Sequence, residues 1–98
     1  MEFKRDEPVK IRFTIPDRPT VRQQMAYYSE ATGVTSKAHL ERLWIGARTL
    51  VIDWECELFK HDVDLDSVDN PEIMNTMLWA AIQVRDHLNR MGDIPKNS

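Results

Sequence analysis

One alternating segment constrains the fold of this chain more than any other part of its sequence. Residues 9–15 read VKIRFTI, and this period of two places the apolar side chains on one face of a β-strand. Pro16 and Pro19 end the strand, because proline cannot donate to a sheet ladder. No second alternating run follows. We therefore expect the strand to pair with another copy, to pair with another protein, or to lie against helices as an extended arm.

Two helices are expected after the strand. Thr20-Val21-Arg22-Gln23 has the spacing of a capping box, in which the threonine and glutamine side chains satisfy first-turn amides. This predicts a helix over 20–32, ended by Gly33, since glycine takes the left-handed conformation of a helix end without strain. Thr35 or Ser36 then caps a second helix over 36–60. Its apolar side chains follow in steps of three and four: Leu40, Leu43, Trp44, Ala47, Val51, Trp54 and Leu58.

The third predicted helix covers 70–91. Asn70-Pro71-Glu72 provides a cap, a proline where its missing N–H costs nothing, and an acid favoured by the helix dipole. Its apolar stripe is Ile73, Met77, Ala81, Val84, Leu88 and Met91. Packing of the two long stripes predicts a mainly α fold, in which an N-terminal β-strand or arm is followed by three helices, the last two long and antiparallel. Residues 1–8 form a charged lead and residues 92–98 a polar tail.

Length and composition limit the class of protein. The 98 residues suit one compact domain with a modest core, and the single cysteine, Cys56, cannot form an internal disulfide. No apolar run approaches the roughly 20 residues that a membrane-spanning helix needs. The sequence therefore predicts a protein of the cytoplasm with no membrane partner.

Charge is unevenly distributed along the chain. Residues 1–50 carry nine basic and six acidic side chains, whereas residues 51–98 carry four basic and ten acidic ones. Our preferred interpretation is ordinary solvation of helix surfaces. Binding of two different partners, or head-to-tail pairing in a homo-oligomer, is compatible with the same distribution.

No group of residues indicates catalysis, a cofactor or a metal. Residues 62–66 resemble the start of a calcium loop, but Ser67 stands where glycine is needed and Ile73 where glutamate is needed. The three histidines lack ligand spacing, and only three glycines occur, so we expect no zinc site and no phosphate-binding loop. The protein is therefore not expected to be an enzyme.

The order of a strand, a helix, a turn with Gly33 and a second helix resembles a ribbon-helix-helix repressor. The resemblance covers about half of the chain. In that family, strands from two subunits pair and insert their polar face into the major groove, which here implies Lys10, Arg12 and Thr14 as DNA-binding residues. Nucleic acid is a partner only under this alternative, and the net charge of −3 disfavours it.

A second resemblance covers nearly the whole chain. It rests on Phe13-Thr14-Ile15-Pro16, Arg18-Pro19-Thr20-Val21-Arg22-Gln23, Glu41-Arg42-Leu43-Trp44, Asp53-Trp54-Glu55 and Asp93-Ile94-Pro95-Lys96-Asn97-Ser98. Together these segments resemble a tail assembly chaperone of a long-tailed bacteriophage. The resemblance implies a mostly helical protein of the host cytoplasm that acts by binding alone. Such a protein coats the hydrophobic helices of the tape measure protein and helps recruit tail tube subunits.

A chaperone of this kind needs exposed apolar surface with an acidic rim that can hold a partner helix. Methionines and large aromatic side chains suit such a surface because they adapt to varied partners or bury large areas. The residues expected to bind the partner are Phe13, Trp44, Trp54, Met74, Met77 and Trp79. The unpaired strand also predicts a homo-oligomer. An inhibitor that docks on a host protein through its acidic face is compatible with the same pattern.

Overall fold

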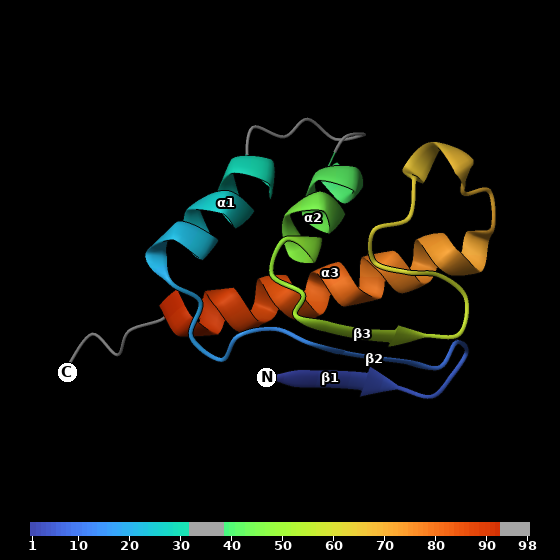
Figure 1. Cartoon of the computed structure of the whole chain (residues 1–98), viewed down its shortest axis with the longest axis horizontal. Helices are drawn as coiled ribbons and strands as arrows, with labels where there is room; N and C mark the ends of the chain where they lie inside the picture. Colours follow the sequence, from blue (N-terminus) through green and yellow to red (C-terminus); the bar gives the residue numbers. More distant parts are fainter. Residues whose placement is uncertain (32–38, 93–98) are drawn as a thin grey trace.

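The computed structural model describes residues 1–31 and 39–92 of the chain. Within these ranges the backbone forms three strands, three α-helices and a short 3-10 helix (Figure 1). The elements, in chain order, are β1 (Glu2–Arg5), β2 (Ile11–Thr14), α1 (Val21–Ala31), α2 (His39–Arg48), β3 (Asp53–Cys56), η1 (Leu65–Ser67) and α3 (Pro71–Gly92). The fold is therefore mixed α/β.

The three strands form one antiparallel sheet in the order β1-β2-β3. A hairpin loop that contains the cis peptide bond Glu7–Pro8 joins β1 to β2. In contrast, α1 and α2 separate β2 from β3 in the sequence. Phe3, Phe13 and Trp54 lie opposite one another across the three strands. The predicted strand is thus the centre of a sheet built entirely from its own chain.

This sheet overturns the prediction of a mainly α fold with a lone strand. β1 was missed because only one of its inward positions, Phe3, is apolar. The other is Arg5, whose guanidinium lies 4.7 Å from the ring centroid of Trp79. Because β2 has a neighbour on each edge, it is not free to pair with another copy. The homo-oligomer prediction, which was based on an unpaired strand, is therefore no longer supported by β2.

The predicted second helix over 36–60 is wrong beyond Arg48, where α2 ends. The carbonyl of Gly46 accepts from both the backbone N–H and the hydroxyl of Thr49, at 3.2 and 2.6 Å, which closes the last turn. The chain then enters β3, so the last two helices are not both long: α2 has 10 residues and α3 has 22. The predicted turn and caps over 33–36, and the tail from 93, lie outside the described residues.

The starts of α1 and α3 agree with the predicted caps. Thr20 Oγ1 accepts from the N–H of Gln23 at 3.2 Å, and the N–H of Thr20 donates to Gln23 Oε1 at 2.8 Å, as a capping box requires. At α3, Asn70 Oδ1 accepts from the N–H of Glu72 at 2.9 Å. Both caps depend on residues within one helical turn, so the local sequence suffices to specify them.

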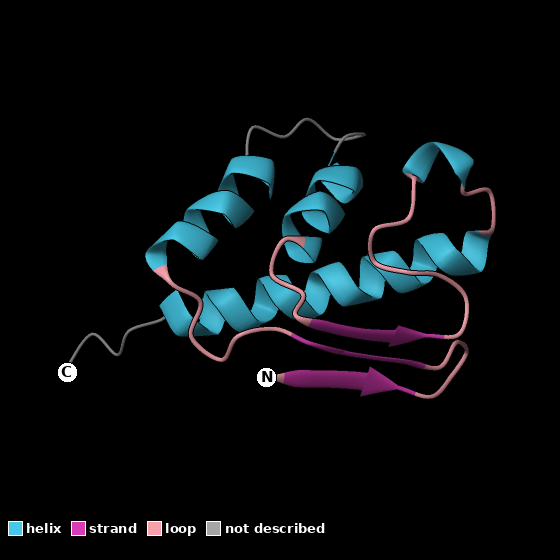
Figure 2. Ribbon diagram, in the orientation of Figure 1, coloured by secondary structure: helices cyan, strands magenta, loops and turns pink. Residues whose placement is uncertain are grey.

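The core lies where α3 meets the inner face of the sheet. α3 runs along the length of the molecule, with α1 and α2 on one side and the sheet on the other (Figure 2). Phe13, 1% exposed, is near its centre. Its ring centroid is 5.1 Å from that of Phe3, 5.5 Å from that of Trp54 and 6.0 Å from that of Trp79. These contacts join two strands and the long helix to β2.

Candidate protein-binding groove

A groove of about 520 Å³ lies between α2, the segment around η1 and the first turns of α3. Its volume falls within the range of roughly 300–1,000 Å³ that is typical of pockets for small-molecule ligands. In Figure 1 the η1 segment stands beside the start of α3. Leu65 and Val68 of this segment line the groove.

The floor of the groove is apolar. α2 contributes Trp44, and α3 contributes Met74, Met77 and Leu78, whose spacing places them on one helix face. Trp44 and Met77 are buried, whereas Met74 is 57% exposed. A thioether side chain at the opening can change rotamer to fit differently shaped apolar groups, because methionine is unbranched and flexible.

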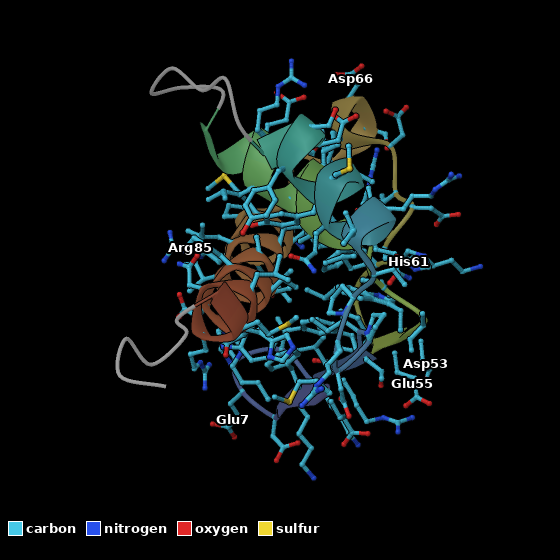
Figure 3. The ribbon with its side chains drawn as sticks, turned by 90° about the vertical axis from the view of Figure 1, so that its left-hand side faces the viewer. Glu7, Asp53, Glu55, His61, Asp66 and Arg85 are labelled. Atoms are coloured by element: carbon cyan, nitrogen blue, oxygen red, sulfur yellow. The ribbon has the colours of Figure 1, made fainter. Side chains whose placement is uncertain are left out.

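Carboxylates surround this floor. Glu41 of α2 lines the groove together with Asp66 and Asp69 of the η1 segment, and its described lining contains no basic side chain. Asp64 fixes the 3-10 turn by accepting from the backbone N–H of Asp66 at 3.0 Å. The side chain of Asp66 points outward at η1, far from the sheet (Figure 3). The resulting potential is negative and favours a cationic ligand.

Trp44 has a buried hydrogen-bond donor without a partner. The residue is 2% exposed, and its indole Nε1 donates to no group of the described part of the chain. Its neighbour Trp54 differs, since Trp54 Nε1 donates to the carbonyl of Phe59 at 2.9 Å. An unsatisfied buried donor costs about 1–3 kcal/mol relative to a paired one. Because Trp44 Nε1 has almost no accessible surface, the folded chain bears this cost.

The groove brings together three of the six residues predicted to bind a partner: Trp44, Met74 and Met77. The other three, Phe13, Trp54 and Trp79, pack with one another in the core instead. Their aromatic character has a structural role here, because they fill the space between the sheet and the helices.

The residues of the DNA-binding alternative lie on the outer face of the sheet. Arg12 is surrounded by carboxylates, with Nη2 2.5 Å from Glu55 Oε1, Nη1 3.3 Å from Glu2 Oε2, and Nη2 4.0 Å from Asp53 Oδ2. The hydrogen bond to Glu55 and its charge raise the pKa of Arg12, with a further contribution from Glu2. Asp53 and Glu55 project outward from this face in Figure 3.

These carboxylates oppose binding of a phosphate backbone. A second concavity, of about 490 Å³, has a mixed lining of four basic residues, Lys4, Lys10, Arg12 and Lys60, and three acidic ones, Asp6, Glu55 and Glu57. Thr14 lies opposite Glu2 and Asp53 in the sheet. A paired ribbon would also require β2 to give up β1 or β3, so the pairing of the sheet opposes the DNA-binding alternative.

No known protein family, characterised protein or solved structure matches this chain. The site is therefore interpreted from its own chemistry. Among the described residues, no group of histidine, cysteine and acidic side chains has the geometry to hold a metal ion. Likewise, none of the helices in the described ranges is long and apolar enough to cross a bilayer.

Sequence reasoning missed the η1 wall of the groove, including Leu65 and Val68. The aspartates of this segment, at positions 62, 64, 66 and 69, are exposed. The apolar Leu65 and Val68, spaced three residues apart within this acidic segment, were the available signal. Only the path of the loop beside α3 reveals that they face a shared concavity.

Proposed function

We propose that this protein is a non-enzymatic tail assembly chaperone of a long-tailed bacteriophage. It acts in the host cytoplasm, where it binds the tape measure protein, keeps it soluble and helps recruit tail tube subunits. The single observation that carries the proposal is the groove, which combines an apolar floor with an acidic rim. A chaperone of long hydrophobic helices requires this combination, because the floor binds apolar side chains while the rim keeps the free chaperone hydrated.

The chemistry of the floor supports binding to many similar segments in place of one fixed ligand. Met74 and Met77 can adjust to leucine, isoleucine, valine or phenylalanine with little strain. A tape measure helix presents such side chains repeatedly at helical spacing, and an amphipathic helix laid in a groove is a common mode of recognition.

Co-expression tests the proposal. The chain is expressed with the long helical protein encoded nearby in its genome, and the soluble fraction of that protein is measured with and without the chain. We expect the wild type to raise this fraction and Met74→Glu to abolish the effect, because a carboxylate at an apolar contact is costly to desolvate.

Met25→Glu is the matched control. Met25 is 67% exposed on α1, outside the groove, and the substitution is chemically identical. We expect it to retain wild-type activity. The proposal fails if the wild type leaves the long helical protein insoluble, or if both variants perform equally well while remaining folded by circular dichroism.

A further inference from the structure

We infer that the exposed face of α1 from one copy of this chain occupies the groove of the next copy, so that the protein self-associates head to tail. The inference goes beyond the proposed function, because it concerns what covers the groove when no tape measure protein is bound. It depends on the chemistry of two surfaces of this chain, α1 and the groove.

The exposed face of α1 is largely apolar. Val21 and Met25, one helical turn apart, are 72% and 67% exposed. Ala26 and Ser29 extend this face and are exposed as well. The other side of the helix carries Tyr27, which is 2% exposed and belongs to the core. Large apolar side chains that remain exposed together on a helix already packed on its other side indicate a surface for a partner.

The same face carries positive charge. Arg22 is the only charged residue over 21–29, is exposed, and neighbours Met25 on the helix surface. Arg18, just before the helix, is also exposed. Neither arginine takes part in an ion pair within the described ranges. A partner of this face therefore needs apolar surface together with negative charge.

The carboxylates closest to α1 in the sequence already have partners. Asp17 pairs with the amino group of Met1, and Glu30 Oε2 lies 3.4 Å from Arg42 Nη1. The positive charge of the α1 face is therefore not neutralised within its own copy.

The groove has the complementary character. Glu41, Asp66 and Asp69 line it, and none of its described lining residues is basic. Met74 lies at the opening of the apolar floor. A cationic helix face with Met25 at its centre matches the groove in both respects, since the apolar side chain contacts the floor while the arginines lie at the carboxylates.

The two surfaces lie at opposite ends of the molecule. In Figure 1, α1 lies toward the C-terminal end of α3, whereas η1 lies toward its N-terminal end. The 22 residues of α3 span about 33 Å between these ends. A chain therefore cannot fill its own groove with its own α1. A contact between two copies leaves one α1 face and one groove free, so association continues beyond a dimer.

Analytical ultracentrifugation of the full-length chain tests the inference. One helix of 11 residues in one groove makes a small interface, so we expect a dissociation constant on the order of 100 µM. The weight-average mass of the wild type should exceed that of a dimer at about 500 µM protein. It should fall as NaCl rises from about 50 to about 500 mM, because salt screens the charges.

Two single substitutions separate the surfaces. Met25→Glu places a carboxylate on the α1 face, and Met74→Glu places one at the opening of the groove. Each variant alone should remain monomeric, because the new carboxylate is costly to desolvate. Both side chains are largely exposed in the monomer, so the fold is expected to persist, which circular dichroism checks.

An equimolar mixture of these two variants is the decisive sample. The Met25→Glu chain keeps an intact groove, and the Met74→Glu chain keeps an intact α1 face, so one contact of the inferred kind can form between them. We expect the mass of the mixture to approach that of a dimer without exceeding it.

Charge reversal provides an independent test. Arg22→Glu should weaken self-association roughly three- to tenfold, and so should Asp66→Lys combined with Asp69→Lys. A mixture of these two chains should associate again, because opposite charges face each other once more. The control is Lys4→Glu, which makes the same change as Arg22→Glu at an exposed position of β1 outside both surfaces. We expect it to self-associate as the wild type does.

Several outcomes overturn the inference. A wild type that stays monomeric at the highest concentration would do so, as would a mixture of the two methionine variants that stays monomeric. Association retained by Met74→Glu alone identifies pairing of α1 with α1, and association retained by Met25→Glu alone identifies pairing of two grooves. Association retained by both variants identifies another surface.

These outcomes are separable from the co-expression result. Met25→Glu leaves the groove intact, so it should keep the long helical protein soluble although it no longer self-associates. If the wild type associates head to tail but leaves the long helical protein insoluble, the inference stands and the proposed function is wrong. If the chain solubilises that protein and shows no self-association, the proposed function stands and the inference is wrong.

Discussion

Arg5 and Trp44 both have buried nitrogen atoms without hydrogen-bond partners among the described residues. Arg5 has Nε and Nη2 buried without hydrogen-bond partners in the described structure. Its guanidinium stacks over Trp79, and a cation–π contact of this kind returns about 0.5–2 kcal/mol. Trp44 has no such internal compensation for its Nε1 and lies beside a groove. The guanidinium of Arg5 is therefore compensated by a ring contact, whereas the indole N–H of Trp44 is paired with no described group.

Phe13 provides the sharpest stability test at this scale. Phe13→Ala should lower the free energy of unfolding by about 3–5 kcal/mol, because it opens a cavity among three aromatic neighbours. Phe13→Leu should cost less than Phe13→Ala, because it leaves a smaller cavity. Urea denaturation followed by tryptophan fluorescence measures both. Val21→Ala, at a side chain 72% exposed, is the control. A loss from Phe13→Ala no larger than that of the control would contradict the placement of Phe13 in the core.

Asp17 predicts a pH dependence of stability. The amino group of Met1 hydrogen-bonds to the Asp17 carboxylate and, with its charge, lowers the pKa of Asp17; the charge of His87 adds to this. A carboxyl with a lowered pKa in the folded state stabilises the protein above its unfolded pKa of about 3.9. That contribution is lost as the pH falls through the folded value.

Asp17→Asn should therefore be less stable than the wild type near neutral pH, with a difference that shrinks below pH of about 3.9. Urea midpoints measured across the acid range in low salt give this difference. The effect should be small and should weaken in high salt, since both groups are accessible to water. A difference that stays constant down to the lowest pH would show that the ion pair does not contribute.

Among the helices and strands, features that depend on neighbouring residues could be predicted from the sequence, whereas the pairing of distant strands could not. Thr20 and Asn70 act on amides two or three residues away, so their caps could be predicted from the sequence. β3 could not be predicted, because two patterns overlap in its sequence. Val51, Trp54 and Leu58 continue the helical spacing of α2, whereas exposed and half-buried side chains alternate over residues 53–56, as in a strand. The contact that decides between these patterns is the pairing of β3 with β2, about 40 residues earlier in the chain.

The residues of the groove likewise include some that could be predicted from the sequence and some that could not. Trp44, Met74 and Met77 were identified by residue type and helix position, and the structure brings them together. The contribution of Leu65 depends on where a loop runs, which no local pattern specifies. Phe13 and Trp79 were expected to bind a partner, because the sheet that packs against them was not foreseen.

The cap of α1 can be tested by itself. Thr20→Ala removes the acceptor for the N–H of Gln23 and should cost about 1 kcal/mol in the free energy of unfolding. Thr20→Ser keeps the hydroxyl and should cost little. Thermal and urea unfolding monitored by circular dichroism compare the two variants. Equal losses for alanine and serine would mean that the hydroxyl does not cap the helix.

For the whole molecule, β1 protects the centre of the sheet. Deleting residues 1–8 removes Phe3 and Arg5 from the inner face and leaves β2 with an open edge. We expect a loss of about 3 kcal/mol or more in the free energy of unfolding. We also expect concentration-dependent self-association, since an exposed edge pairs with other chains. Denaturation and analytical ultracentrifugation measure these effects.

The control for this deletion changes only outward side chains of β1. Glu2→Gln combined with Lys4→Gln keeps the strand and its inward residues. We expect this variant to match the wild type in its free energy of unfolding and in its sedimentation. A truncated chain that unfolds at the wild-type midpoint and sediments independently of concentration would contradict the protective role of β1.

The order of the strands also has a consequence during synthesis. The β1–β2 hairpin is translated first, but an isolated two-stranded hairpin is marginally stable at best. Its third strand follows only after α1 and α2, and the helix that covers its inner face comes last. A nascent chain on the ribosome must therefore remain open until α3 has left the exit tunnel, and its aromatic side chains stay accessible to cellular folding factors for most of translation.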